Sequence, residues 1–398
     1  MKILFVTSEF GSNGGGLSLS SERVFNYLSE RYSVQIVNPK NPQVLVADGG
    51  YNQELASAIR HENDLKIDAY QYKDKDIDYV IAFGGGFNGY YASILSQRIN
   101  SSFILCLRGT DVNLAKWSPI ETFYLKESAI HSHKVVCLSR EMIENLRLID
   151  KSLCIKCVLI PNSIVGGGDV TFMEKQNSTI VIGTASTHLN EKKGVANLLS
   201  LVKLAKEGGI DINLELVGEI DADLYESYVK IINNFEISDH ITFHGRISRP
   251  ELSLLMRDWD LYVQASVCEG HPNSVIESLE NGISFISTRT GYIFEKLHCD
   301  FPEYFFDDNT PASMLKGVLA LLNDKKLALR SEQLRDNLLK SSDSNTIKKL
   351  WYKLLESPSK EMYCAFDGDN ILSVGLHDVQ GEVYDSITTP IDVFRQFV

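Results

Sequence analysis

The feature that most constrains this chain is a regular alternation of short apolar runs with longer segments of helical periodicity. Continuous apolar runs are typical of strands buried on both faces, and their alternation with helices favours βα units around a parallel sheet. The series ends near residue 165 and starts again at Thr179, after the glycine-rich stretch 163–178. The expected strands are Lys2–Val6, Val34–Val37, Tyr79–Phe83, Phe103–Leu107, Lys134–Leu138 and Val158–Ile160, and then Thr179–Gly183, Ile212–Gly218, Ile241–Phe243, Asp260–Gln264, Ser284–Ser287 and Tyr304–Phe306.

Two such series predict an α/β protein with two doubly wound parallel-sheet domains facing a cleft. Ligands in such sheets bind beyond the carboxyl ends of the strands. We expect the first domain in residues 1–165 and the second in residues 166–345. A helix at 346–360 is expected to return to the first domain. Residues 361–398 form an appended tail with one Arg against seven Asp and Glu, and its β-prone runs predict a hairpin.

Charge and apolar length limit the classes of protein to which the chain can belong. The net charge of −13 arises after residue 165, because the first 165 residues hold 17 basic and 17 acidic side chains. A chain this acidic is a poor candidate for binding nucleic acid. No apolar run reaches the roughly 18–20 residues of a membrane-spanning helix, and Met1–Val6 is too short for a signal peptide. We therefore expect a cytoplasmic protein, with peripheral contact at the inner face of the membrane and the oligomeric state left open.

Neither the cysteines nor the acidic residues predict a metal site. The seven cysteines are scattered, and Cys154 and Cys157 have a CxxC spacing without a second ligand pair. Asp221 and Asp223 have the spacing of a metal-binding DxD motif. They lie where a helix is expected to begin, so capping and first-turn charge explain them. We expect reduced structural cysteines and no metal.

The most informative segment is Ser266–Leu279, which follows a buried strand and opens a helix. Pro272 and Asn273 are typical of a helix start. The free backbone N–H groups of Ser274 and Val275 would then be able to hold a phosphate. Two carboxylates, Glu269 before the helix and Glu277 inside it, flank this position. Such a set suits the diphosphate and hydroxyls of a sugar nucleotide, whereas a solvated loop Glu and a first-turn Glu are the alternative.

This segment resembles a known signature. Its pattern Glu-Gly-x-Pro-Asn-x-x-x-Glu, from Glu269 to Glu277, is similar to that of the retaining glycosyltransferases of family 4, also called glycosyl transferases group 1. The resemblance covers residues 1–358 and implies the GT-B fold, with a Rossmann-like acceptor domain followed by a Rossmann-like donor domain. The surrounding segments that agree with it are Ile160–Ser163, Lys193-Gly194, Trp259–Val263, Gly282 and Thr288–Gly291.

The resemblance also implies roles for residues of the second domain. Glu277 would bind the ribose hydroxyls and Glu269 a hydroxyl of the donor sugar, while Ser274 and Val275 would bind the diphosphate. Lys193 would neutralise the diphosphate as it leaves. The family's Gly-Arg after the first strand of this domain reads Gly183-Thr184 here, so a second phosphate cation would have to come from Lys192, Arg246 or Arg108. The remaining donor-side candidates are Asn273, Gly270, His271, Thr184, Gly15 and Gly16.

In the first domain the resemblance points to three loops that follow strands. Gly11–Gly16 would cover the donor phosphates, and Gly84–Gly86, with Gly85 on the acceptor side, would line the same cleft. Arg108 stands where many relatives have a His, so no histidine base is implied. Arg108 could instead bind an acceptor carboxylate or a phosphate, and Asp111 could orient it.

The predicted function is a retaining, metal-independent hexosyltransferase without a cofactor. It would move a sugar from a nucleoside diphosphate sugar, a UDP-sugar being favoured, to a hydroxyl of a glycan, a lipid-linked molecule or a protein. Glu269, Lys193 and Arg108 would carry catalysis. Two alternatives stay open: a nucleotide-sugar 2-epimerase of the same fold, and an inactive glycosyltransferase-like subunit that binds a glycan or a partner.

Overall fold

The structure is a computed structural model that describes residues 1–11, 15–39, 70–73, 75–115, 117–164, 170–172, 179–356, 362–367, 370–377 and 383–384. The chain divides into two compact units. Unit 1 comprises Met1–Ser12, Leu17–Pro161 and Ile347–Val398, and unit 2 comprises Asn13–Gly16 and Asn162–Thr346.

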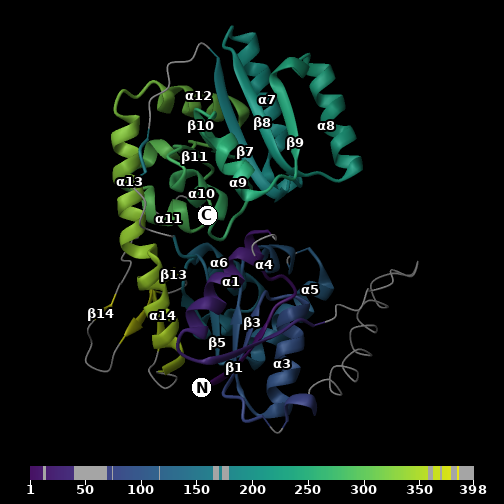
Figure 1. Cartoon of the computed structure of the whole chain (residues 1–398), viewed down its shortest axis with the longest axis vertical. Coiled ribbons are helices and arrows are strands. Elements are labelled where there is room, and N and C mark those ends of the chain that lie inside the picture. The colour runs from purple at the N-terminus through teal and green to yellow at the C-terminus, as the bar shows by residue number, and fades with distance from the viewer. Residues whose placement is uncertain are drawn as a thin grey trace. The chain divides into compact units, whose positions relative to one another are not determined.

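Unit 1 is built on a six-stranded parallel sheet with the order β2-β1-β3-β4-β5-β6 (Figure 1). The order changes direction between β1 and β3, which makes the carboxyl edge there the expected ligand side of a doubly wound sheet. The strands are β1 (Lys2–Val6), β2 (Ser33–Val37), β3 (Tyr79–Phe83), β4 (Ser102–Cys106), β5 (Lys134–Cys137) and β6 (Cys157–Leu159).

Helices cover both faces of this sheet because successive strand residues point to opposite sides. Ile3 and Phe5 pack against α1 and α14, whereas Leu4 and Val6 belong to the core under α3, α4, α5 and α6. Trp351 of α14 is 1% exposed, so the last long helix is part of the core of unit 1. The helices are α1 (Gly16–Ser29), α3 (Phe87–Ile99), α4 (Thr110–Ala115), α5 (Pro119–His131), α6 (Arg140–Ile149) and α14 (Ser344–Glu356), with 3₁₀ turns η1 (Tyr70–Tyr72) and η2 (Lys151–Lys156).

Unit 2 is a second parallel sheet, of five strands in the order β11-β10-β7-β8-β9. Its direction changes between β7 and β10. At this position Gly183 of β7 leaves room for the indole ring of the buried Trp259, because a Cβ on residue 183 would lie 2.1 Å from a carbon of that ring. The strands are β7 (Ile180–His188), β8 (Ile212–Glu219), β9 (Ile241–Gly245), β10 (Leu261–Gln264) and β11 (Phe285–Ser287).

The helical elements of unit 2 follow each strand, as βα units require. They are η3 (Glu191–Lys193), α7 (Val195–Glu207), α8 (Ala222–Phe235), η4 (Ser238–His240), α9 (Arg249–Met256), α10 (Asn273–Glu280), α11 (Gly291–Leu297), η5 (Pro302–Tyr304), α12 (Pro311–Leu322) and α13 (Leu327–Ser342).

Two strand predictions are wrong in detail. Tyr304–Phe306 is not a strand of the sheet: Pro302–Tyr304 form a 3₁₀ turn, and Phe305 makes an isolated bridge to Ser287. Its aromatic residues are buried as packing groups, which a short apolar run does not distinguish from a strand. The predicted strand Thr179–Gly183 is too short, because β7 runs five residues beyond Gly183 and ends at His188.

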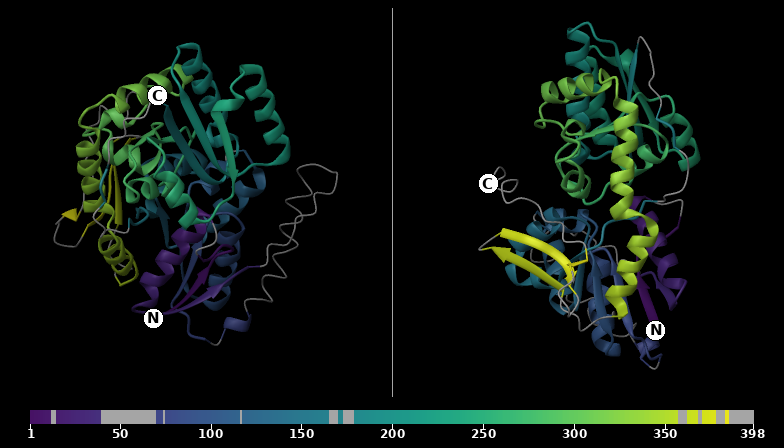
Figure 2. Two further views of the ribbon diagram at one scale, coloured as in Figure 1. Left: turned by 45° about the horizontal axis from the view of Figure 1, so that its top comes forward. Right: turned by 90° about the vertical axis from the view of Figure 1, so that its left-hand side faces the viewer.

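The appended tail contains a hairpin within unit 1, drawn in yellow in Figure 2. β12 (Met362–Asp367) pairs antiparallel with β13 (Asn370–His377), which pairs with β14 (Val383–Tyr384). Cys154 and Cys157 are buried free thiols, and Gly166–Gly168 of the predicted linker lie outside the described residues.

Candidate functional site: a cation, two carboxylates and a helix start in unit 2

The candidate site of unit 2 lies where the order of its sheet changes direction. β7 and β10 are parallel neighbours, so the loops that follow them leave the same edge of the sheet. The loop after β7 contains η3 with Lys192 and Lys193, and the loop after β10 contains Glu269 and leads into α10.

Gly194 is the reason that these two loops can touch. Its φ of +68° is a left-handed conformation, and a Cβ would lie 2.2 Å from the carbonyl oxygen of Ala265. Only glycine meets both demands without strain. Beside it, the backbone N–H of Val267 donates to the carbonyl of Lys192 at 2.8 Å. The loop that carries Lys193 is therefore fixed directly against the loop that carries Glu269.

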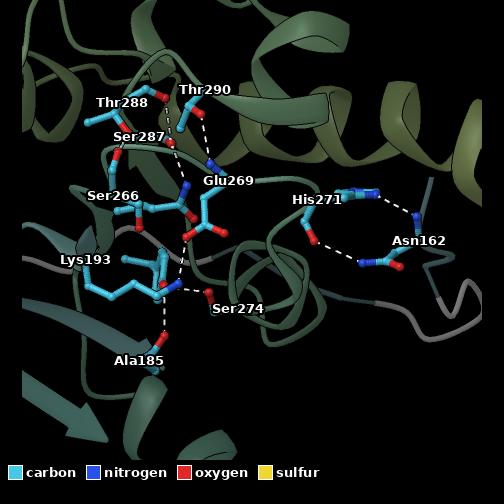
Figure 3. Close-up of polar contacts among 12 residues, drawn as sticks. Asn162, Ala185, Lys193, Ser266, Glu269, His271, Ser274, Ser287, Thr288 and Thr290 are labelled. Carbon is cyan, nitrogen blue, oxygen red and sulfur yellow. Dashed lines mark hydrogen bonds and ion pairs between the residues drawn. The ribbon is translucent and has the colours of Figure 1, made fainter. Parts of the chain in front are cut away.

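Lys193 and Glu269 form an ion pair across this junction. Lys193 Nζ donates to Glu269 Oε1 at 2.7 Å, and the two side chains are only 20% and 13% exposed. Figure 3 shows them pointing toward each other. The pairing confirms no role by itself, but it brings together two residues that lie 76 positions apart in the sequence.

The charges of the pair are stabilised in both partners. Burial alone would raise the pKa of the Glu269 carboxyl, but Lys193, Ser266 and Lys192 outweigh it and hold that pKa below its usual range. Burial would likewise lower the pKa of the Lys193 ammonium, but Glu269 outweighs it and raises that pKa. The site therefore holds a persistent cation beside a persistent anion.

The loop after β11 orients Glu269 from the other side. The hydroxyl Oγ1 of Thr290 accepts from the backbone N–H of Glu269 at 3.0 Å, and Thr288 Oγ1 donates to the carbonyl of Ser266 at 2.6 Å (Figure 3). Next to Thr290, Gly291 leaves no room for a side chain, since a Cβ would lie 2.6 Å from the carbonyl oxygen of Gly270. The segment before α10 is thus held between neighbouring loops.

α10 begins at Asn273, with Pro272 as its N-cap residue and no side-chain cap. The first N–H groups of an α-helix, here those of Asn273, Ser274 and Val275, have no partner within the helix and carry partial positive charge. The buried Tyr262 links this helix start to the sheet: its hydroxyl lies 2.8 Å from Ser274 Oγ and 3.3 Å from the carbonyl oxygen of Ala185.

Tyr262 is a candidate site residue that the sequence does not reveal, because its pattern there indicates only a buried strand. Burial raises the pKa of its phenol, against hydrogen bonds to Ser274 and Thr184 and the charge of Lys193. The phenol therefore stays neutral. Thr184 lies in β7 and is 5% exposed, so its hydroxyl is part of this polar interior. A threonine cannot supply the second phosphate cation.

His271 is occupied in holding the chain. The backbone N–H of Asn162 donates to its Nδ1 at 3.0 Å, and the side-chain amide of Asn162 donates to its carbonyl at 3.0 Å (Figure 3). The ring is 4% exposed and lies 4.8 Å, centroid to centroid, from the ring of Tyr292. Its surroundings in the structure are those of a packed histidine.

Glu277 has a cationic neighbour that the sequence did not reveal. Arg249 Nε lies 3.7 Å from Glu277 Oε1, and the side chains are 33% and 21% exposed. Arg249 is the first residue of α9, which a capping box of Ser248 and Glu251 starts. The capping box was a readable signal for the helix start, but not for the carboxylate that Arg249 would meet.

Arg246 does not stand alone as a phosphate cation. It lies 3.4 Å from the carboxylate of Glu219 at the end of β8, and His188 lies 3.5 Å from the same carboxylate. Both pairs are well exposed, so they are screened by water. In the contacts described for the structure, Arg246 and His188 thus share the Glu219 carboxylate and neither contacts Lys193.

In unit 1 the predicted acceptor-side residues are bound to the backbone. The carboxylate of Asp111 accepts from the N–H groups of Gly85, Arg108, Gly109 and Val112 at 2.8–3.1 Å. It therefore ties the loop after β3 to the loop after β4. A Cβ on Gly85 would lie 2.5 Å from Leu107, so this glycine is required for packing.

Arg108 turns its guanidinium inward. The guanidinium carbon lies 3.7 Å from the ring centroid of Phe83, and burial lowers the pKa of this group against the favourable influence of Cys106 and Asp111. A cation over an aromatic face is stabilised in that position. Gly15 precedes α1 and Gly16 begins it, while the part of their loop at 12–14 lies outside the described residues.

The described residues contain no group of three or more His, Cys, Asp or Glu side chains arranged to hold a metal ion. Within the same part of the chain, no helix combines the length and the apolar character needed to cross a membrane.

Comparison with known proteins shows what this chain is similar to. Residues 172–337, most of unit 2, match the family described as glycosyl transferases group 1. The chain is therefore similar to this family over that segment. Its fold is GT-B, because solved glycosyltransferases align with both units.

The similar structures share the fold at low sequence identity. HepE of Anabaena, solved with UDP and glucose, aligns over 90% of this chain and 100% of its own, with a TM-score of 0.68 and 15% identity. Sucrose-phosphate synthase of Thermosynechococcus elongatus aligns over 90% of this chain and 98% of its own, with a TM-score of 0.71 and 14% identity.

The curated relatives are more similar in sequence. An uncharacterized glycosyltransferase of Methanocaldococcus jannaschii is 25% identical over 269 residues, which is 67% of this chain and 71% of the relative. Protein CapJ of Staphylococcus aureus is 22% identical over 266 residues, which is 63% of each chain.

Proposed function

We propose that this protein is a retaining glycosyltransferase that moves a hexose from a nucleoside diphosphate sugar to a hydroxyl of a glycan, a lipid-linked molecule or a protein. The observation that carries the proposal is the half-buried pair of Lys193 and Glu269, 2.7 Å apart, beside the uncapped start of α10. The neighbours solved with UDP, glucose and UDP-glucose favour a UDP-sugar as the donor.

The diphosphate is proposed to bind between Lys193 and the first turn of α10. An ammonium ion and free backbone N–H groups together stabilise an anion without a metal. The ion pair supports this role in two ways. Glu269 holds the ammonium in one place, and its carboxylate balances the charge of that ammonium. Preorganised charge of this kind stabilises a leaving group most.

The sugar and the ribose are proposed to be bound by the two carboxylates. The second oxygen of Glu269 accepts from a hydroxyl of the donor sugar, and Glu277 accepts from the ribose hydroxyls. Arg249 supports this role of Glu277, because a cation 3.7 Å away favours the ionised carboxylate and restricts its rotamers.

In the proposed reaction the bond between the anomeric carbon and the diphosphate breaks, and the acceptor hydroxyl bonds to that carbon on the same face. The acceptor proton passes to the leaving phosphate oxygen. No protein nucleophile takes part. The residues of this chain bind the two substrates, neutralise the leaving group and hold the sugar.

The test is calorimetric titration of the full chain with a panel of nucleoside diphosphate sugars, followed by measurement of diphosphate release. We expect one donor, a UDP-sugar, to bind, and Lys193→Met to weaken its binding by roughly tenfold or more, the effect of losing one charged hydrogen bond. Lys203→Met is the matched control, since Lys203 pairs with Glu207 on the surface of α7. Equal losses in both variants, or no binding of any donor, would refute the proposal.

Two outcomes would select the alternatives. A change of stereochemistry in the free nucleotide sugar without an acceptor would identify an epimerase. Donor binding without release in the presence of any acceptor would identify a binding subunit. Retention itself is read from the anomeric coupling constant of the product by NMR.

A further inference from the structure

Glu121 is a carboxylate at the carboxyl edge of the unit 1 sheet for which the proposed reaction has no use. It lies in the first turn of α5, is half-buried, and follows the N-cap residue Ser118 by three positions. The sequence Ser-x-x-Glu predicts a capping box, in which the Glu carboxylate binds the N-cap backbone.

The structure shows that Glu121 does not make this bond, whereas an identical pattern elsewhere does. In α9 the carboxylate of Glu251 accepts from both the N–H and the hydroxyl of Ser248, at 2.8 and 2.6 Å. In α5 only the Ser118 half of the box is present. Within the described part of the chain, no hydrogen bond or ion pair reaches the Glu121 carboxylate.

The carboxylate is instead turned to the loop after β3. Glu121 Oε2 lies 2.8 Å from the position that a Cβ on Gly86 would occupy, and Gly86 is the N-cap residue of α3. Burial, and then the charge of Asp111, raise the pKa of Glu121. A half-buried carboxylate without a partner is costly, so a ligand that donates a hydrogen bond would be favoured there.

The surroundings indicate the class of ligand. Phe87 and Tyr124 pack edge to face beside Gly86, with ring centroids 5.9 Å apart, and Phe87 is only half-buried. Trp117, in the turn that leads into α5, is 87% exposed. A carboxylate for hydroxyl groups together with accessible aromatic faces for C–H groups suits a carbohydrate.

We propose that Glu121 binds a hydroxyl of a sugar acceptor. The inference deepens the proposed function and rests on it. It assigns the acceptor contact of unit 1 to Glu121, while Asp111 and Arg108 hold the loops around it. Glu121 is a binding residue in this assignment, and the proton of the reacting hydroxyl still passes to the leaving phosphate.

The experiment uses three variants of the full chain. Glu121→Gln keeps the shape and removes the charge. Gly86→Ala places a methyl group 2.8 Å from Glu121 Oε2, so it displaces the carboxylate while residue 121 remains a glutamate. Glu127→Gln, on the same helix, is the matched control, because Glu127 pairs only with the nearby His131 in the contacts described.

Two measurements are made on each: the affinity for UDP by calorimetry, and UDP release from the bound UDP-sugar with a panel of p-nitrophenyl glycosides as acceptors. We expect at least one glycoside to accelerate release by the unaltered protein. Glu121→Gln and Gly86→Ala should then raise the KM for that glycoside roughly tenfold or more, with unchanged UDP affinity, and Glu127→Gln should change neither.

The outcomes separate the two proposals. If UDP binds but no glycoside accelerates release, or if the glycoside KM of Glu121→Gln stays within twofold of the unaltered protein, the assignment of Glu121 is wrong and the donor site stands. If no nucleotide binds to the unaltered protein, the proposed function is wrong and this inference fails with it.

Discussion

Replacement of Lys193 by Met is expected to destabilise the edge of unit 2 that carries the candidate site. Two unit charges 2.7 Å apart attract by about 6 kcal/mol at an effective dielectric constant of about 20. Desolvation of both groups offsets much of this attraction. Removal of one partner, however, leaves the other mostly buried without its main counter-charge, and the loss of one partner of a buried pair costs about 3–5 kcal/mol. Because the side chains are 20% and 13% exposed, we expect about 3 kcal/mol.

The assay is a double-mutant cycle of Lys193→Met, Glu269→Gln and the double variant, read by hydrogen exchange of peptides from η3 and α10. Hydrogen exchange reports the free energy of local opening, so it separates this edge from the unfolding of unit 1. We expect the double variant to lose at least 1.5 kcal/mol less than the sum of the single variants, since it carries no unpaired charge. Additive losses, or a loss below about 1 kcal/mol for Lys193→Met, would refute the reasoning.

Four further results are expected. The ion pair should contribute fully to the stability of unit 2 between about pH 4.3 and 10.4, the ordinary pKa values of Glu and Lys in the unfolded chain. Because folding lowers the pKa of Glu269 and raises that of Lys193, the contribution should be lost only as the pH falls through the lowered pKa or rises through the raised one. A loss near neutral pH in a denaturation series would contradict this. Glu277→Ala should weaken UDP binding by about 1–3 kcal/mol in calorimetry, and unchanged affinity would exclude its ribose role. Gly194→Ala should reduce donor binding, because the added Cβ would lie 2.2 Å from the carbonyl oxygen of Ala265; wild-type affinity would show that the loop tolerates displacement. Asp111→Asn should lower the Tm of unit 1, since it supplies an amide N–H group where backbone N–H groups point; a retained Tm would show that the loops after β3 and β4 do not depend on this carboxylate.

Much of the fold could be predicted because its signals are local. The apolar runs at Lys2–Val6 and Tyr79–Phe83 coincide with β1 and β3. Hydrophobic periodicity depends on neighbours along the chain, which is why it marks strands and helices well. The same reasoning was wrong at Tyr304–Phe306, where buried aromatic residues pack without joining the ladder.

The candidate site was predicted less evenly. The start of α10 at Asn273 agrees with the helix signals of Pro272 and Asn273. The sequence could not show that Lys193 would meet Glu269 rather than solvent, or that Lys192 would instead bind the loop through its carbonyl. That choice depends on Gly194 and on which strands are neighbours.

The sequence by itself therefore determined where strands and helices form and which short segment has the chemistry of a sugar-nucleotide site. Only the tertiary structure decided the partner of each charged side chain. Arg249 pairs with Glu277, Arg246 pairs with Glu219, and Asp111 accepts from four backbone N–H groups. The carboxylate of Glu121 lies beside Gly86 instead of making the capping bond. The physical reason is range. Backbone conformation follows from interactions within a few residues, whereas the partner of a side chain is set by sheet order, which brings together residues from distant parts of the chain.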